Sequence, residues 1–202
     1  MVNHRTGATT GTLDRRAAVA ALLRHRGDTL VVTGLGSPTY DVHAAGDRPD
    51  NYYLWGAMGG AALVGLGLAQ AQPTRRVLVI TGDGEQLMAL GSFATIAVAR
   101  PRNLDLLVVD NGHYGETGMQ ASHTGLGLDL AAVAAAAGFA ATGTVWSATE
   151  LEALIATLRT AASGPRCHVV KVSADAPPRS MPSRDAVYIK TRFRAHLGLG
   201  AG

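Results

Sequence analysis

Two polar clusters, each placed directly after an apolar run, carry side chains suited to a metal ion. The first run leads into Gly82-Asp83-Gly84 and the second into Asp110-Asn111-Gly112. Asp83 offers a carboxylate oxygen, Asn111 offers an amide oxygen, and the irregular chain beyond can turn the main-chain carbonyl of His113 inward. Three protein oxygens leave three octahedral positions open, which suits Mg²⁺ shared with a phosphorylated ligand. The implied ligand is a diphosphate.

The segments around these clusters predict how they are positioned. Val77 to Thr81 and Leu104 to Val109 have the composition of buried parallel strands. Between them, Glu85 to Arg100 carries apolar residues at helical spacing and ends before a proline. A right-handed crossover brings the carboxyl ends of both strands to one edge of the sheet, where open α/β sheets bind ligands. We therefore expect Asp83 and Asn111 to face each other across one crevice.

The whole chain alternates five or six apolar strands with helices, which predicts an α/β fold: a doubly wound, mostly parallel sheet with helices on both faces. Asp129 and Thr149 are the expected caps of two late helices, over 130–137 and 150–162. We expect three parts: a flexible N-terminus over 1–11, one binding domain over 12–174, and a C-terminal tail with a short helix over 175–202.

Composition excludes several classes of protein. The formal charge of +3 is modest and no basic stripe is interleaved with aromatic residues, so we expect no nucleic-acid partner. No apolar run reaches the length of a membrane span and no signal-peptide pattern is present, so we expect no membrane association. Cys167 is the single cysteine and sits in a strand pattern, which predicts a buried, inert thiol and a reducing compartment. We expect a cytoplasmic protein.

The spacing of the two clusters is more specific than either cluster alone. Gly-Asp-Gly is a common turn sequence, but here 25 residues separate it from Asp110-Asn111. This order and spacing resemble the thiamine-diphosphate-binding motif, in which GDG is followed by a pair ending in Asn. Asp110 replaces the commoner Asn at a position that is not a metal ligand in the motif. The resemblance implies thiamine diphosphate and Mg²⁺, with Mg²⁺ on Asp83, Asn111 and the carbonyl of His113, and the diphosphate lined by Gly82, Gly84, Glu85, Tyr114 and Gly115.

An upstream segment, Trp55-Gly56-Ala57-Met58-Gly59, is similar to the part of this family that meets the other end of the cofactor. The resemblance assigns the Gly56 carbonyl to the 4′-amino group of the aminopyrimidine, and Met58 to the wedge that bends the cofactor. A thioether fills a gap between two rings without offering a competing hydrogen bond. Without the resemblance, ordinary packing at a helix start would be the preferred interpretation of Met58.

From about Thr12 to Val172 the order of elements is similar to the diphosphate-binding half of sulfopyruvate and phosphonopyruvate decarboxylases, and the chain resembles the sulfopyruvate enzymes' β subunit. The resemblance implies a carboxy-lyase that converts a small 2-oxo acid into an aldehyde and CO₂. Thiamine diphosphate needs a carboxylic acid from a pyrimidine-binding domain, and nothing in this chain matches that domain. We therefore expect an α partner that supplies a catalytic Glu, in a hetero-oligomer of two α and two β subunits or larger. His113 and His123 are candidate proton shuttles, although a histidine in a polar loop is often merely solvated.

Three alternatives remain open at this point. Another thiamine-dependent carboligase, such as an acetolactate-synthase-like enzyme, would share every cofactor residue. A non-catalytic partner subunit would bind the cofactor only to stabilise a complex. A nicotinamide-dependent oxidoreductase would need a complete glycine fingerprint with an acidic residue about 20 positions on, and Gly34-Leu35-Gly36-Ser37 does not provide one.

Overall fold

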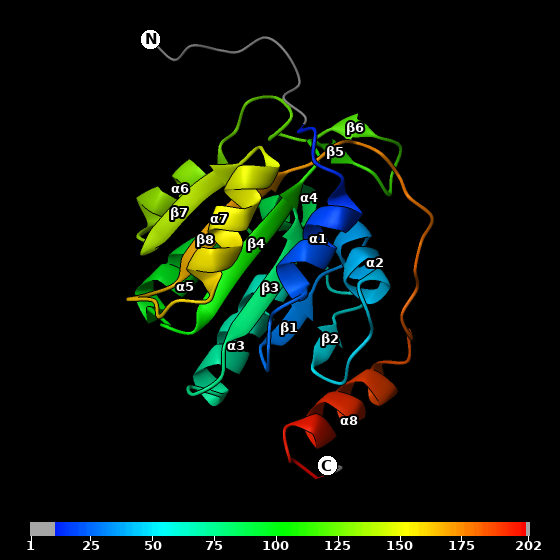
Figure 1. Ribbon diagram of the computed structural model, residues 1–202, viewed down its shortest axis with the longest axis vertical. Helices are drawn as coiled ribbons and strands as arrows, with labels where there is room; N and C mark the ends of the chain where they lie inside the picture. The colour runs from blue at the N-terminus through cyan, green and yellow to red at the C-terminus, as the bar shows by residue number, and fades with distance from the viewer. Residues whose placement is uncertain (1–10, 201–202) are drawn as a thin grey trace.

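Six short strands, four of them rich in Val, Leu and Ile, form a central sheet in which every neighbouring pair of strands is parallel (Figure 1). The computed structural model describes residues 11–200. The strand order is β2-β1-β3-β4-β8-β7, which confirms the predicted doubly wound α/β architecture. The strands are β1 (Leu30–Thr33), β2 (Asn51–Tyr53), β3 (Val77–Gly82), β4 (Leu104–Asp110), β7 (Ala141–Val145) and β8 (Arg166–Lys171).

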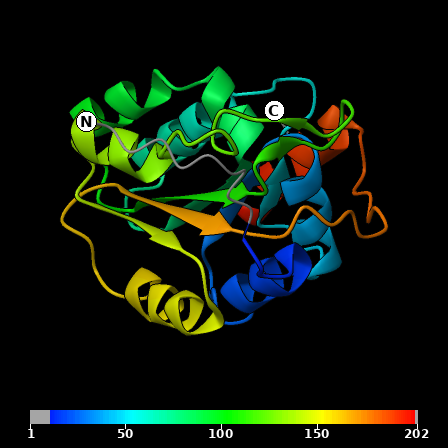
Figure 2. The ribbon, with the colours of Figure 1, turned by 90° about the horizontal axis from the view of Figure 1, so that it is seen from above.

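Helices cover both faces of this sheet, as seen from above in Figure 2. One apolar core joins the sheet to α3 (Ala61–Ala71), α5 (Ser92–Ala99) and α6 (Leu130–Ala137). A second core, on the opposite face, joins it to α1 (Arg15–Leu23), α2 (Ser37–Ala44) and α7 (Ala148–Leu158). Strands buried on both faces lack polar alternation, and all seven residues of β4 are buried.

The register of β3 and β4 places the carboxyl ends of the two strands side by side. Gly82 at the end of β3 pairs with Val109 of β4, and Asp110 ends β4 one residue later. The short helix α4 (Asp83–Met88) begins directly after β3. The two polar clusters therefore emerge at the same edge of the sheet, as the sequence predicts. A hairpin of β5 (His113–Tyr114) and β6 (Gln120–Ala121) follows β4 at this edge (Figure 1).

The single helix predicted over Glu85 to Arg100 is wrong, because the chain breaks between α4 and α5. The buried Gln86 amide donates to the carbonyl of Ala89 at 3.3 Å and to Ser92 Oγ at 3.1 Å. The Gln86 side chain thus takes the place of helical backbone hydrogen bonds at the break. Gly91 lies in the same break, and glycine is unfavourable in the interior of a helix.

The predicted cap Asp129 is confirmed for α6, since its side chain accepts from the Ala132 amide at 3.0 Å. The predicted cap Thr149 is wrong. Ser147 caps α7 through a capping box in which Ser147 Oγ accepts from the Glu150 amide and Glu150 Oε2 accepts from the Ser147 amide. The reciprocal pair fixes the helix start two residues earlier.

The C-terminal segment is anchored at both ends of the molecule. Residues 173–185, which we call the C-terminal strap, run from the end of β8 along the outside of α1 and α2 to α8 (Ala186–His196) at the far end (Figure 1). Ile189 and Phe193 of α8 are buried, and the Phe193 and Tyr52 rings pack edge to face with their centroids 5.4 Å apart. The predicted helix in this tail is confirmed. The predicted flexible segment 1–11 lies outside the described residues except for Gly11.

Candidate functional site

A cavity of about 290 Å³ opens at the carboxyl ends of the central strands. It is lined by the loop after β1, the start of α2, the β3–α4 junction, the end of β4 and the loop that carries β5. The sequence-predicted cofactor and metal residues line it together, except for Gly56. Those lining it are Met58, Gly82, Asp83, Gly84, Glu85, Asn111, His113, Tyr114 and Gly115.

The Asp83 carboxylate is held by two hydroxyl groups. Its Oδ2 accepts from Ser122 Oγ at 2.5 Å and from Thr124 Oγ1 at 3.1 Å, and the residue is only 2% exposed. Both hydroxyls bond the same oxygen, so within residues 11–200 Oδ1 has no side-chain donor. Burial raises the pKa of Asp83 to about 6, and the nearby Asp110 charge adds to the effect. A cation at Oδ1 would offset both causes, so this carboxylate fits a divalent ion.

Asn111 presents the second oxygen expected of a metal site. Its Oδ1 accepts the His113 amide at 3.0 Å, which uses one of two lone pairs on the amide oxygen. The His113 ring in turn places Nδ1 2.8 Å from the Asn111 carbonyl. Over the described residues no group of three or more His, Cys, Asp or Glu side chains could hold a metal. A metal here would therefore rest on mixed carboxylate, amide and carbonyl oxygens, which suits Mg²⁺.

Asp110, at the position where the related motif commonly has Asn, is neutralised from the neighbouring strand. Its Oδ2 lies 2.6 Å from Lys171 Nζ of β8, and the two residues pair in the strand register. Its Oδ1 accepts from the Gly112 amide and from Thr124 Oγ1, both at 2.8 Å. Asp110 does not line the cavity. The extra negative charge is thus matched by Lys171, and Thr124 links it to Asp83.

Glu85 also lines the cavity, but its carboxylate is directed into the protein. It is 3% exposed, and it accepts from the Gly59 amide at 3.2 Å and from Thr81 Oγ1 at 2.9 Å. A β-carbon at Gly34 would overlap it, at 1.5 Å from Oε2. The side chain of Glu85 therefore ties β3 to the loops that precede α2 and α3. The contact of Glu85 with a diphosphate stays a prediction. Because the carboxylate is bonded elsewhere, such a contact would be made by the Glu85 backbone.

Glycines shape the floor and the upstream loop. A β-carbon at Gly84 would lie 2.7 Å from Tyr114 Cδ1, so the absent side chain is what lets the Tyr114 ring lie against this turn. Gly56 and Gly59 flank Met58 with φ of +76° and +88°, a conformation that favours glycine. These two glycines present Met58 to the cavity, where its side chain is 46% exposed.

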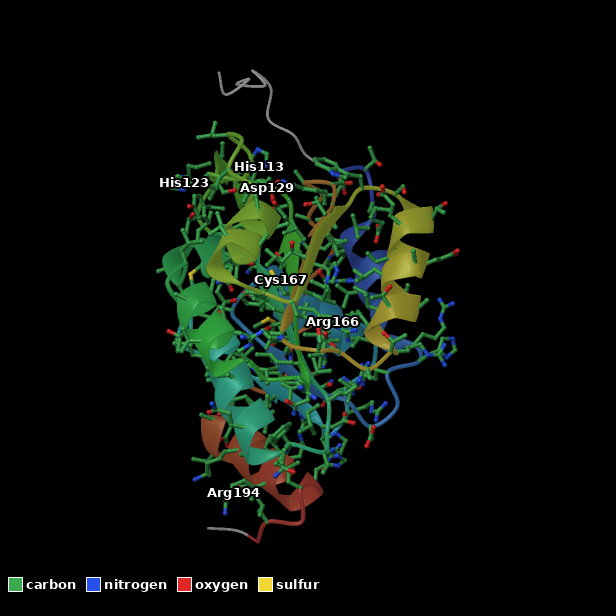
Figure 3. All side chains as sticks on the ribbon, turned by 90° about the vertical axis from the view of Figure 1, so that its left-hand side faces the viewer. His113, His123, Asp129, Arg166, Cys167 and Arg194 are labelled. Atoms are coloured by element: carbon green, nitrogen blue, oxygen red, sulfur yellow. The ribbon has the colours of Figure 1, made fainter. Side chains whose placement is uncertain are left out.

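The two candidate proton shuttles differ in position, although both lie at the cavity end of the molecule (Figure 3). His113 is half-buried and lines the cavity. His123 is exposed, does not line the cavity, and approaches it only through Nδ1, 3.4 Å from the Tyr114 hydroxyl. Both catalytic assignments stay predictions, and His113 has the better placement.

Several site residues were missed by the sequence interpretation. Ser122 and Thr124 are buried and hold Asp83, yet they lie in a polar loop without periodicity. Arg15 and Tyr40 line the cavity from α1 and α2. The sequence carries no local signal for them, since each is placed by tertiary packing. Cys167 is fully buried, as predicted (Figure 3).

Comparison with known proteins agrees with this geometry. A family model described as "Thiamine pyrophosphate enzyme, C-terminal TPP binding domain" matches residues 35–172. The sulfopyruvate decarboxylase subunit beta of Methanothermobacter thermautotrophicus is 40% identical over 127 residues, which cover 63% of this chain and 68% of that one. The phosphonopyruvate decarboxylase of Streptomyces hygroscopicus is 40% identical over 158 residues, which cover 77% of this chain but only 39% of that one.

A solved structure shares the fold. Benzoylformate decarboxylase from Polynucleobacter necessarius matches with a TM-score of 0.68 and 20% identity, over 86% of this chain and 36% of that chain. The region matched by the family model contains both polar clusters and the cavity residues between Leu35 and Thr117. The chain therefore belongs to the thiamine pyrophosphate enzymes, through their C-terminal TPP-binding domain, and its named relatives are decarboxylases.

Proposed function

We propose that this chain is the Mg²⁺- and thiamine-diphosphate-binding subunit of a two-component 2-oxo acid decarboxylase. Asp83, Asn111 and the His113 carbonyl would hold Mg²⁺, and the turn at Gly82 and Gly84 would accept the diphosphate. When bound, thiamine diphosphate supplies a carbon nucleophile and an electron sink for loss of CO₂ from a 2-oxo acid. The carboxylate of Asp83 is the observation that carries the proposal, because it is buried beside the cavity and one of its oxygens has no side-chain donor among residues 11–200.

The chain's own residues would act mainly by positioning. The Gly56 carbonyl and Met58 would orient the aminopyrimidine from the upstream loop. Ser122 and Thr124 would hold the metal-binding carboxylate in one orientation, because they fix its Oδ2. His113 would hold or release a proton at the substrate side of the cavity. The product would be an aldehyde, formed after CO₂ leaves.

A partner subunit would complete the site. The relatives named subunit beta imply a second subunit in those enzymes, and the acid that activates the cofactor would come from it. Two methionine side chains near the cavity are exposed, Met58 at 46% and Met88 at 65%. They are close together, because a β-carbon at Gly59, next to Met58, would lie 3.5 Å from Met88 Cβ. Contiguous exposed apolar patches mark protein interfaces, and these two side chains would contribute to such a patch. The proposed assembly is a hetero-oligomer of two α and two β subunits or larger.

The relatives support a proposal for the substrate class. Sulfopyruvate and phosphonopyruvate are small 2-oxo acids with a second anionic group, and enzymes named for both are about equally similar to this chain. The test is to purify the chain with its natural partner and supply Mg²⁺, thiamine diphosphate and each of sulfopyruvate, phosphonopyruvate and pyruvate. CO₂ and an aldehyde should form with at least one dianionic substrate. Turnover by the chain without a partner, or carboligation products in place of an aldehyde, would contradict the proposal.

A further inference from the structure

The charged groups that line the cavity are poorly matched to a substrate with two anions. They are Asp83, Glu85, Glu116 and Arg15 among the described carboxylates and arginines. Arg15 is already committed, because its Nε lies 2.5 Å from Asp41 Oδ2 and both side chains are buried. Removing one member of such a buried pair is costly. Asp41 therefore holds the Arg15 guanidinium in one position through its Nε, and the lining carries three carboxylates against this one arginine.

A different arginine stands at the mouth of the cavity, on the C-terminal strap. Arg179 donates from Nη2 to Glu116 Oε2 at 2.8 Å, and its guanidinium carbon lies 5.6 Å from the centre of the Tyr40 ring. Glu116 and Tyr40 both line the cavity. Glu116 packs over Gly36, where a β-carbon would meet its Cγ at 3.3 Å. A residue about 140 positions from α2 in sequence thus reaches the cavity rim.

The ion pair between Arg179 and Glu116 is easily exchanged. The side chains are 61% and 41% exposed, and ion pairs between exposed side chains contribute little to stability. A guanidinium offers several parallel N–H donors, a geometry that matches the oxygens of a phosphonate or sulfonate. An incoming anion of that kind would replace Glu116 at small cost.

The strap holds Arg179 in place independently of this ion pair. Arg16 donates to the carbonyl of Pro178 at 2.7 Å, and His43 Nδ1 lies 2.8 Å from Ser180 Oγ. Further along, the Trp55 indole donates to the carbonyl of Ser183 at 2.8 Å. The backbone on both sides of Arg179 is therefore fixed to α1 and α2. Only its side chain needs to move to change partner.

We infer that Arg179 is a specificity-determining residue that binds the second anionic group of the substrate, with Glu116 as its counter-ion when the site is empty. The inference rests on the proposed function for the class of substrate. It assigns a role to the C-terminal strap, which lies beyond the region matched by the family model. Arg179 acts on binding of the remote anion and not on the reacting carbon.

Binding of unreactive analogues tests this assignment directly. The complex of the chain with its partner, loaded with Mg²⁺ and thiamine diphosphate, is titrated calorimetrically with 3-phosphonopropionate, 3-sulfopropionate and propionate. Arg179→Gln should weaken binding of the two dianions by about ten-fold, the loss of one charge-assisted contact, and leave propionate unchanged. Arg179→Lys should recover part of the loss. Glu116→Gln should tighten dianion binding, because it removes the competing carboxylate.

A matched control separates a local effect from a general change in charge. Arg102→Gln removes the same charge from an exposed side chain at the amino end of β4, and should leave all three affinities unchanged. The inference would be overturned if Arg179→Gln bound the two dianions as tightly as the unchanged protein does, or if its affinity for propionate fell by the same factor. Turnover is measured separately: a complex that binds dianions through Arg179 but decarboxylates no 2-oxo acid would refute the proposed function and leave the anion site standing.

Discussion

The hydroxyl of Thr124 is expected to stabilise the protein by bonding the buried carboxylates of Asp83 and Asp110, which lie close together. Thr124 is 1% exposed, and its Oγ1 lies 2.8 Å from Asp110 Oδ1 and 3.1 Å from Asp83 Oδ2. The one proton of this hydroxyl is shared between the two carboxylates, with the shorter distance to Asp110. Ser122, at 2.5 Å, donates to Asp83. Thr124→Val therefore removes one hydrogen bond to a charged acceptor and sets a methyl group between the carboxylates.

The magnitude follows from that count. A hydrogen bond to a charged group contributes about 1.5–3 kcal/mol, so we expect Thr124→Val to lower the free energy of unfolding by about 2 kcal/mol. For a chain of this length, each kcal/mol shifts Tm by about 2–4 °C, which predicts a fall of about 4–8 °C. Thermal and urea denaturation followed by circular dichroism, without Mg²⁺, measure both quantities.

The control is Thr149→Val, which makes the same chemical change at an exposed position of α7. It should change Tm by about 1 °C or less, because surface substitutions usually stay within about 0.5 kcal/mol. Equal Tm values for the two variants would refute the view that the hydroxyl network holds the strand tips together. Ser122→Ala should resemble Thr124→Val, since it removes the donor to Asp83.

Two further predictions concern β8. The Cys167 thiol is fully buried and burial raises its pKa to about 12, so a disulfide reagent at pH 8 should modify it only at the rate of unfolding; rapid labelling of the native protein would contradict this. Burial lowers the pKa of His168 below its ordinary 6.5, so the folded state favours the neutral ring. Stability should therefore fall as the pH drops below about 6.5, because the unfolded chain gains a proton there before the folded chain does. His168→Gln should flatten the dependence of Tm on pH between 8 and 5.5, and an unchanged slope would count against the assignment.

The sequence predicted the sheet and the shared position of Asp83 and Asn111 at one cavity for identifiable reasons. Strands buried on both faces read as continuous apolar runs, so β3 and β4 are visible without tertiary information. Asp83 and Asn111 lie at strand ends, and parallel topology alone brings such positions to one edge. These features depend on local composition and on chain connectivity, both of which a sequence contains.

Other features depend on contacts between distant segments. The break between α4 and α5 is set by the buried amide of Gln86, which helical periodicity does not reveal. The direction of the Glu85 carboxylate is set by Gly59 and Thr81, which lie in other elements. Arg179 meets the cavity only because the C-terminal strap returns past α1 and α2. The start of α7 was predictable, however, since Ser147 and Glu150 form a capping box that Thr149 obscured.

Asp83 is expected to be essential for cofactor binding. Calorimetry should be used to measure thiamine diphosphate binding to the complex of this chain with its partner, with Mg²⁺ and with EDTA, for the unchanged protein, Asp83→Asn and the exposed control Asp28→Asn. We expect tight, Mg²⁺-dependent binding in the unchanged protein and in Asp28→Asn, and its loss in Asp83→Asn without loss of the folded state. Undiminished Mg²⁺-dependent affinity in Asp83→Asn would contradict the proposed metal site.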